Sequence, residues 1–336
     1  MRYGKLFVCL CTASGYFAAS GMPGPAHATP NAQSFIYYGI ERPDLASATT
    51  AALRQAYGTW SVSPVGQPNS LFLGGMAFSN VAEFSTPSVF TFVRNPRARV
   101  TAWRTRNSQL SIALEEPNDG FDPMRLRAME SEFDDAFRPQ QLIPDITAQL
   151  STKASWGGFE IAGIARDLGF EKLKIWETGR DRPKGNWAGW GVNVSGSLNV
   201  SEQDQLITGI VFGRGIANYL SDGGVDLAAG GTPTDPHAAA MPLYGLSAYY
   251  DHSWARGWSS AVGFSVTKVD NAPMQAPNAY RMGEYASVNL FYSPDANLAI
   301  GGEVLWGQRT DRSHDAGEDM RVQFSFKYAF GTKPEI

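Results

Sequence analysis

Residues 321–330 read RVQFSFKYAF, and this stretch decides the fold. Every second residue from Val322 to Phe330 is apolar or aromatic, while those between are polar, charged or small. An alternation of period two predicts a β-strand with one apolar and one polar face. The same pattern recurs over 187–200, 258–267 and 296–308, with glycine and serine on the polar face. Such strands, apolar outside and polar inside, are typical of barrels in an outer membrane.

The predicted connections alternate in length along the chain. Short turns are expected at 106–108, 154–156, 201–204, 253–257 and 293–295, and long loops at 116–144, 168–186, 214–241, 268–283 and 310–319. Short turns at one rim and long loops at the other are the pattern of outer-membrane barrels. The sequence therefore predicts an all-β fold, a transmembrane antiparallel up-and-down β-barrel. A secreted soluble sandwich is the alternative.

About fourteen strands are predicted, and an even number places both termini on the periplasmic side. The expected ranges are 35–40, 53–60, 70–77, 97–105, 109–115, 145–153, 157–167, 187–200, 205–213, 242–252, 258–267, 284–293, 296–308 and 320–330. No internal repeat or linker divides them, so residues 29–336 are predicted to form a single barrel domain.

Residues 1–28 are predicted to be a cleaved signal peptide. Two basic residues precede a mostly apolar stretch over 6–19, and Ala-His-Ala at 26–28 fits a cleavage site. An N-terminal core helix is the alternative. Both cysteines, Cys9 and Cys11, lie in this range, so we expect the mature chain to have no disulfide, thiolate metal site or cysteine nucleophile.

Composition and motifs argue against several function classes. The net charge is −4, which gives no reason to expect a nucleic-acid partner, and no run of about 18 apolar residues predicts a membrane helix. The chain has no nucleophile elbow, no glycine-rich phosphate loop and no metal-ligand pair at helical spacing. Asp251 and His252 could form a dyad that orients a base, although a structural hydrogen bond is the simpler interpretation. We therefore expect no enzyme activity, no cofactor and no metal.

Several segments together resemble the DcaP-like outer-membrane porins. They are LRQAYG at 53–58, FVRNPRARVT at 92–101, LEEP at 114–117, YDHSW at 250–254, NLFYSP at 289–294, GEVLWGQR at 302–309 and RVQF at 321–324. The resemblance implies a trimeric porin of sixteen strands with a periplasmic N-terminal helical extension. This chain is then shortened at its N-terminus by about two strands. The loop over 78–96 takes the place of the inward-folded constriction loop.

The candidate site is a set of charged residues on the inner face of the barrel. Period two places Arg97 and Arg99 inward, Arg94 precedes them, and Glu83 is the acid of the preceding loop. These four residues, Glu83, Arg94, Arg97 and Arg99, are the predicted pore constriction. The predicted pore wall carries Glu115, Lys153, Arg166, Glu303, Arg321 and Lys327, together with Asp145 and Glu160. The alternative is that the arginines only cross-link neighbouring strands through carboxylates.

Charged rings set the selectivity of a pore, and the predicted wall has more bases than acids. We therefore expect a passive diffusion channel in the bacterial outer membrane for small hydrophilic solutes, with a preference for anions. The family resemblance implies dicarboxylate-like solutes and a homotrimer surrounded by outer-membrane lipid. The alternative is a non-conducting structural or adhesion barrel, or a truncated porin remnant.

Overall fold

The computed structural model describes the backbone of the strands given below. It describes side chains over residues 69–82, 93, 95–117, 143–169, 187–228, 239–273, 275–295 and 297–328. Within this part of the chain, no helix is long and apolar enough to cross a membrane.

The first ten strands are β1 (Phe7–Cys9), β2 (Phe17–Ala18), β3 (Ala32–Glu41), β4 (Thr50–Trp60), β5 (Ser63–Gln67), β6 (Arg97–Arg104), β7 (Ser108–Glu115), β8 (Phe137–Pro139), β9 (Asp145–Ala154) and β10 (Gly157–Lys172). The others are β11 (Lys184–Asn199), β12 (Asp204–Arg214), β13 (Leu227–Thr232), β14 (Asp235–Ala240), β15 (Pro242–Ser253), β16 (Trp258–Val269), β17 (Tyr280–Asp295), β18 (Leu298–Asp311) and β19 (Ala316–Tyr328). Three short 3₁₀ turns are η1 (Gly75–Ala77), η2 (Ala217–Tyr219) and η3 (Ala255–Gly257).

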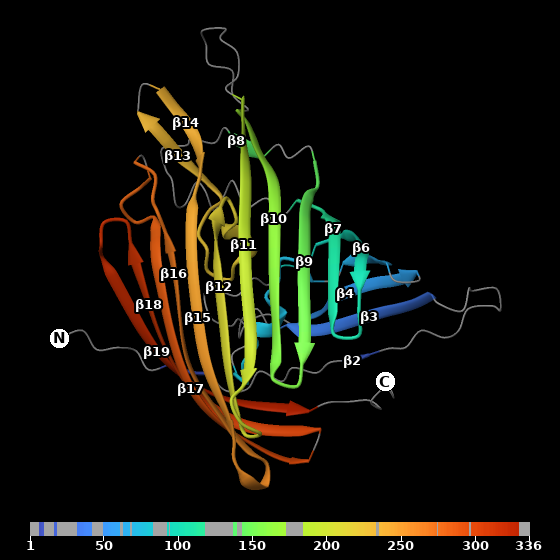
Figure 1. Ribbon diagram of the computed structural model, residues 1–336. Coiled ribbons are helices and arrows are strands. Elements are labelled where there is room, and N and C mark those ends of the chain that lie inside the picture. The colour runs from blue at the N-terminus through green and yellow to red at the C-terminus, as the bar shows by residue number, and fades with distance from the viewer. Residues whose placement is uncertain are drawn as a thin grey trace.

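Seventeen strands join in one sheet, and β13 and β14 form a separate hairpin. Chain neighbours pair antiparallel from β2 to β7, β7 pairs with β9, and the series continues through β12 and β15 to β19. Strand β1 adds to β19 in parallel. The long strands form a strongly curved wall, while β3 and β4 run crosswise to it (Figure 1). The predicted antiparallel meander is confirmed.

The two faces of the wall differ as the alternation predicts. In β12, Ile207 and Val211 are 1% exposed, whereas Leu206, Ile210 and Phe212 are 37–48% exposed. Because the exposed positions carry large apolar side chains, this outer face suits lipid rather than water. The inner face of the described strands carries buried polar residues, among them Ser111, Thr147, Asn193, Ser195, Ser247, Ser265, Ser287, Asn289 and Ser325. Trp156, Trp187, Trp190, Trp254 and Trp258 are exposed, as an aromatic girdle requires, and Trp306 is half-buried.

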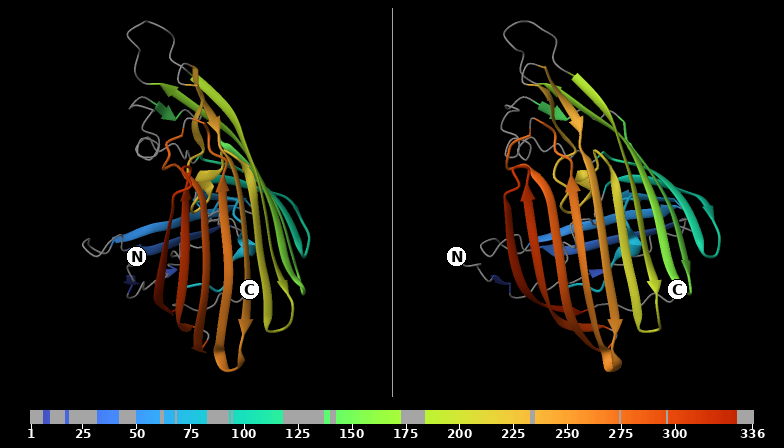
Figure 2. Two further views of the ribbon diagram at one scale, coloured as in Figure 1. Left: turned by 90° about the vertical axis from the view of Figure 1, so that its left-hand side faces the viewer. Right: turned by 60° about the vertical axis from the view of Figure 1, so that its left-hand side comes forward.

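The connections separate into two rims (Figure 2). Short turns join β6 to β7, β9 to β10, β11 to β12, β15 to β16 and β17 to β18. In the turn before β16, Gly257 has φ +82°, and a Cβ there would lie 2.3 Å from the carbonyl oxygen of Ser293, so only glycine fits. The predicted loop over 310–319 is instead a tight turn, because β18 and β19 extend into it and the Asp311 N–H donates to the Asp315 carbonyl.

One predicted strand is wrong. Residues 70–77 form turns and η1 rather than a strand, and the five residues of β5 occupy the place in the wall instead. The apolar run of Leu71, Phe72 and Leu73 resembles half a strand in the sequence, but all three are buried inside the barrel. Each of the other predicted ranges coincides with a strand.

An apolar core lies inside the wall and includes residues of the loop between β12 and β15. Phe72, Ile216, Tyr219 and Leu243 are among its fully buried residues, and Phe72 meets the ring of Tyr219 edge-on at 5.7 Å. The segment containing Phe72 and the loop containing η2 therefore pack together inside the barrel.

Candidate functional site

Residues 70–82, called the inward segment below, lie against the inner wall. The segment follows β5, and the Ser70 N–H donates to the Val93 carbonyl at 2.8 Å. The start of the connection between β5 and β6 thus lies beside its end. The predicted inward loop, 78–96, is therefore found to begin earlier, at Ser70. Residues 83–92 and 94 lie outside the described residues.

Four wall carboxylates accept backbone N–H groups of the inward segment, and we call them the anchoring carboxylates. They are Glu115 from Leu71 at 2.8 Å, Glu160 from Met76 at 3.0 Å, Asp251 from Asn80 at 2.9 Å and Glu303 from Ala82 at 2.8 Å. They come from β7, β10, β15 and β18, so the segment runs along much of the wall. Hydrogen bonds to an ionised acceptor are stronger than neutral ones, which suits a segment with little secondary structure of its own.

Wall side chains also donate to carbonyl groups of the segment. The pairs are Asn193 to Phe72, Gln149 to Leu73, Asn289 to Asn80 and Lys327 to Val81, at 2.7 to 3.1 Å. A buried backbone group without a partner is costly, so these donors take the place of a β-ladder. Asn193, Gln149, Asn289 and Lys327 of the polar inner face are thus explained by the chain that lies against it.

Glycines allow the inward segment to approach the wall closely. A Cβ at Gly74 would lie 3.1 Å from the Ser195 hydroxyl, and one at Gly75 would lie 3.2 Å from the Glu160 carboxylate. Ala77 then packs between Ile207 and Tyr249. Small residues at these positions keep the backbone within hydrogen-bond distance of the wall.

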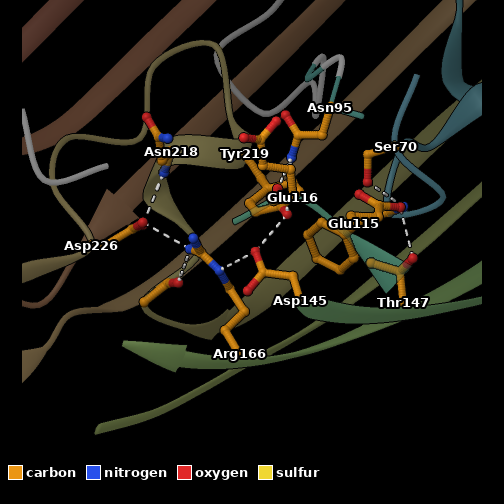
Figure 3. A network of polar contacts seen from close by, with 12 residues as sticks. Ser70, Asn95, Glu115, Glu116, Asp145, Thr147, Arg166, Asn218, Tyr219 and Asp226 are labelled. Atoms are coloured by element: carbon orange, nitrogen blue, oxygen red, sulfur yellow. Dashed lines mark hydrogen bonds and ion pairs between the residues drawn. The ribbon is translucent and has the colours of Figure 1, made fainter. Parts of the chain in front are cut away.

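A buried ionic network fixes the neighbouring loop (Figure 3). The Arg166 guanidinium contacts Asp145 at 2.9 Å and Asp226 at 2.8 Å, and its side chain is fully buried. It also donates to the Gly215 carbonyl at 2.6 Å and lies 4.9 Å from the Tyr219 ring centre. One arginine of β10 therefore joins β9 to the loop after β12.

Tyr219 completes this network from η2. Its hydroxyl donates to Asp145 at 2.8 Å. Burial raises the pKa of the Tyr219 phenol, and the nearby Asp145 carboxylate raises it further. The phenol therefore keeps its proton and remains a donor at any physiological pH.

The predicted constriction residues divide into two groups. Glu83 and Arg94 lie outside the described residues. Arg97 is almost completely buried, with its guanidinium 3.9 Å from Glu115, and Arg99 is half-buried and donates to Ser111 at 2.8 Å. The two described arginines thus lie side by side on the inner face, and Arg97 is packed against a carboxylate.

The predicted wall residues also differ in their surroundings. Lys153 is exposed, and Arg321 and Lys327 are half-buried. Arg166 and Asp145 lie in the buried network, and Glu115, Glu160 and Glu303 anchor the inward segment. The wall acids therefore engage the protein itself, whereas the bases Lys153 and Arg321 lie at more open positions.

Sequence reasoning missed Asp226, Tyr219 and the role of Asp251. The sequence did offer a signal for the contacts between the wall and the inward segment. Asn193 and Asn289 lie within predicted strands, where asparagine is depleted, and both donate to carbonyl groups of the segment. The Asp251–His252 dyad does not form: Asp251 accepts from the inward segment, while His252 contacts Asp204 at 2.6 Å. His252 therefore pairs with Asp204 rather than with Asp251.

Comparison with solved structures identifies the fold. The chain is similar to the outer membrane channel DcaP of Acinetobacter baumannii, with a TM-score of 0.74 and 18% identity over 89% of this chain and 80% of that chain. The fold is that of an outer-membrane porin. This confirms the predicted fold resemblance, and an outer-membrane location agrees with it and with the apolar outer face.

Other outer-membrane protein structures match less closely. An anion-selective porin from Comamonas acidovorans matches with a TM-score of 0.51 and 7% identity, over 91% of this chain and 87% of that chain. A loop L8 deletion mutant of OmpT, an outer membrane protein of Vibrio cholerae, matches with a TM-score of 0.53 and 8% identity, over 90% of this chain and 86% of that chain. No family model and no curated protein matches the chain.

Proposed function

We propose that the protein is an outer-membrane channel for passive diffusion of small hydrophilic solutes. The observation that carries this proposal is the inward segment, which is held by wall side chains along the inside of a barrel whose outer face is apolar. A segment fastened to the wall narrows a pore without filling it. The known channels of the same fold support the proposal.

We further propose a preference for anions. The four anchoring carboxylates each accept a backbone N–H, whereas Lys153 is exposed and Arg99 and Arg321 are half-buried. A narrow, low-dielectric passage strengthens the effect of wall charges on a passing ion. The bases then meet the solute with more effect than the anchored acids do. Glu83 and Arg94 remain part of this proposed constriction.

Small dicarboxylates are the proposed solute class. Arg97 and Arg99 are both inward and two residues apart, which corresponds to about 7 Å along a strand. The planar guanidinium fits a carboxylate well. Such a solute would contact the half-buried Arg99 in passing, with the charge of the buried Arg97 beside it. A homotrimer, implied by the family resemblance, is proposed as the assembly.

Planar-bilayer recording of the purified protein in a salt gradient tests the function. We expect discrete current steps and a reversal potential that indicates anion preference. Arg99→Gln should move that potential toward cation selectivity. Arg214→Gln removes one positive charge at the exposed last residue of β12 and serves as the matched control. Absence of current from a folded barrel would favour the non-conducting structural alternative. An unchanged potential in Arg99→Gln would remove the anion assignment alone.

A further inference from the structure

A polar cavity of about 730 Å³ lies at the rim of short turns, beside the turns that follow β9, β11 and β15. The inward segment reaches it through Asn80, whose side-chain amide donates to the Ser259 hydroxyl at 2.9 Å. Every described residue that lines the cavity is a serine, asparagine, glutamine, aspartate, glutamate or histidine. Small-molecule sites of about 300–1,000 Å³ are usually lined mostly by apolar side chains. This cavity therefore suits a strongly hydrophilic ligand rather than an apolar one.

Two of the carboxylates in the lining are already occupied by donors of the protein. Asp204 accepts the Ser201 hydroxyl at one oxygen, at 2.5 Å. Its other oxygen contacts the Tyr250 hydroxyl at 2.5 Å and the His252 ring at 2.6 Å. Asp251 is held at both oxygens by donors of the inward segment. These two acids have little capacity left for a cation, and the described residues hold no group of three or more histidines, cysteines or acids that could bind a metal ion.

Four other lining side chains have uncommitted hydrogen-bonding groups. Within the described part of the chain, the side chains of Ser155, Gln203 and Ser253 make no hydrogen bond. The Glu202 carboxylate likewise contacts no donor there, and all four residues are exposed. A hydroxyl and a carboxamide both donate and accept, whereas a carboxylate only accepts. Together they match a ligand with many hydroxyl groups, because each such group offers one donor and accepts in turn.

The charge of the lining separates this cavity from the proposed anion path. Among the described residues that line it there is no lysine or arginine, and the histidine, His252, faces Asp204. An anion here would meet the Glu202 carboxylate without a cation to offset the repulsion. The ligand that the cavity fits is therefore neutral as well as hydrophilic.

We propose that this cavity is a binding site for a neutral carbohydrate, a mono- or disaccharide, at the periplasmic mouth of the barrel. Sugar hydroxyls accept from Ser155 and Ser253 and donate to Glu202, while Gln203 does both. The site goes beyond the proposed function, because it depends neither on anion preference nor on conduction. A free sugar and a glycan strand of the cell wall present the same hydroxyl chemistry, so the probes below include both kinds.

Saturation-transfer NMR on the purified barrel, in a detergent without a sugar head group, tests the proposal. The probes are maltose for a free sugar and N,N′-diacetylchitobiose for a wall glycan, and the stronger signal identifies the source. We expect saturation transfer to at least one of them, with millimolar affinity, because the available groups are exposed. Excess succinate should leave the sugar signal unchanged. Displacement by succinate would place the sugar in the anion path and overturn the proposal.

Two substitutions test the location of the site. Gln203→Ala removes an amide with no described protein partner and should weaken sugar binding by about 2–10-fold, the worth of one hydrogen bond. Ser253→Trp fills the cavity and should abolish binding. Asn297→Ala and Asn297→Trp are the matched controls, because Asn297 is exposed in the turn between β17 and β18, on the same rim but outside the lining.

No sugar signal above that of the detergent micelles alone would overturn the proposal. Equal signals from Ser253→Trp and Asn297→Trp in heat-modifiable barrels would do the same. If Ser253→Trp fails to fold, equal affinities of Gln203→Ala and Asn297→Ala are the contradicting result. A barrel that passes no current but binds the sugar at this site would refute the proposed function and support this one.

Discussion

At the scale of single residues, Arg166 shows how a predicted pore-wall charge becomes part of the protein interior. The alternation placed it inward correctly, as it placed Arg97 and Arg99. Nothing in the local sequence indicated that Asp226, sixty residues away, would contact it. Period two predicts the direction of a side chain, whereas its partner depends on how a distant loop folds back.

Arg166→Ala should destabilise the barrel by about 3–5 kcal/mol, because it leaves Asp145 and Asp226 buried without their shared cation. The measurement is the urea midpoint of unfolding in lipid vesicles. Lys268→Ala removes the exposed Lys268–Asp270 pair and should cost about 0–1 kcal/mol. Equal losses in the two variants would contradict the assigned role of the buried network.

At the scale of elements, the inward segment marks the limit of sequence-based prediction. An inward loop was expected from the strand order only over residues 78–96, whereas residues 70–77 were predicted as a strand of the wall. Three apolar residues followed by glycines fit either a short strand or a buried loop. The choice is made by tertiary contacts: wall carboxylates and amides satisfy the segment's backbone, and these partners lie far away in the sequence.

Gly191 on β11 provides a test of how the two inward elements pack. A Cβ there would lie 2.9 Å from both Ile216 and Phe72, so Gly191→Val should push the inward segment and the η2 loop off the wall. Overpacking of this kind costs about 1–3 kcal/mol. We expect faster proteolysis between β12 and β15 in the folded variant. Gly163→Ala, where the nearest atom is 3.9 Å away, should behave as the wild type, and equal proteolysis in both variants would count against this packing.

At the scale of the whole molecule, the outer face predicts a protein that requires lipid or detergent. Exposed apolar residues recur on alternate positions of the described strands from β6 to β19. The folded barrel should therefore migrate on a gel at a different position from the boiled chain. A stable monomer in detergent-free buffer with no such heat-dependent shift would contradict a membrane barrel.

We propose that the inward segment, fastened inside the barrel, narrows a conducting pore. Because Ser70 and Val93 are neighbours, residues 72–91 can be removed and Leu71 joined to Phe92 through two glycines. The most direct measurement is the single-channel conductance of this deletion beside that of the wild type in the same lipid. We expect discrete steps in the wild type and clearly larger steps in the deletion, with both proteins heat-modifiable. Equal steps from two folded barrels, or no steps from either, would contradict it.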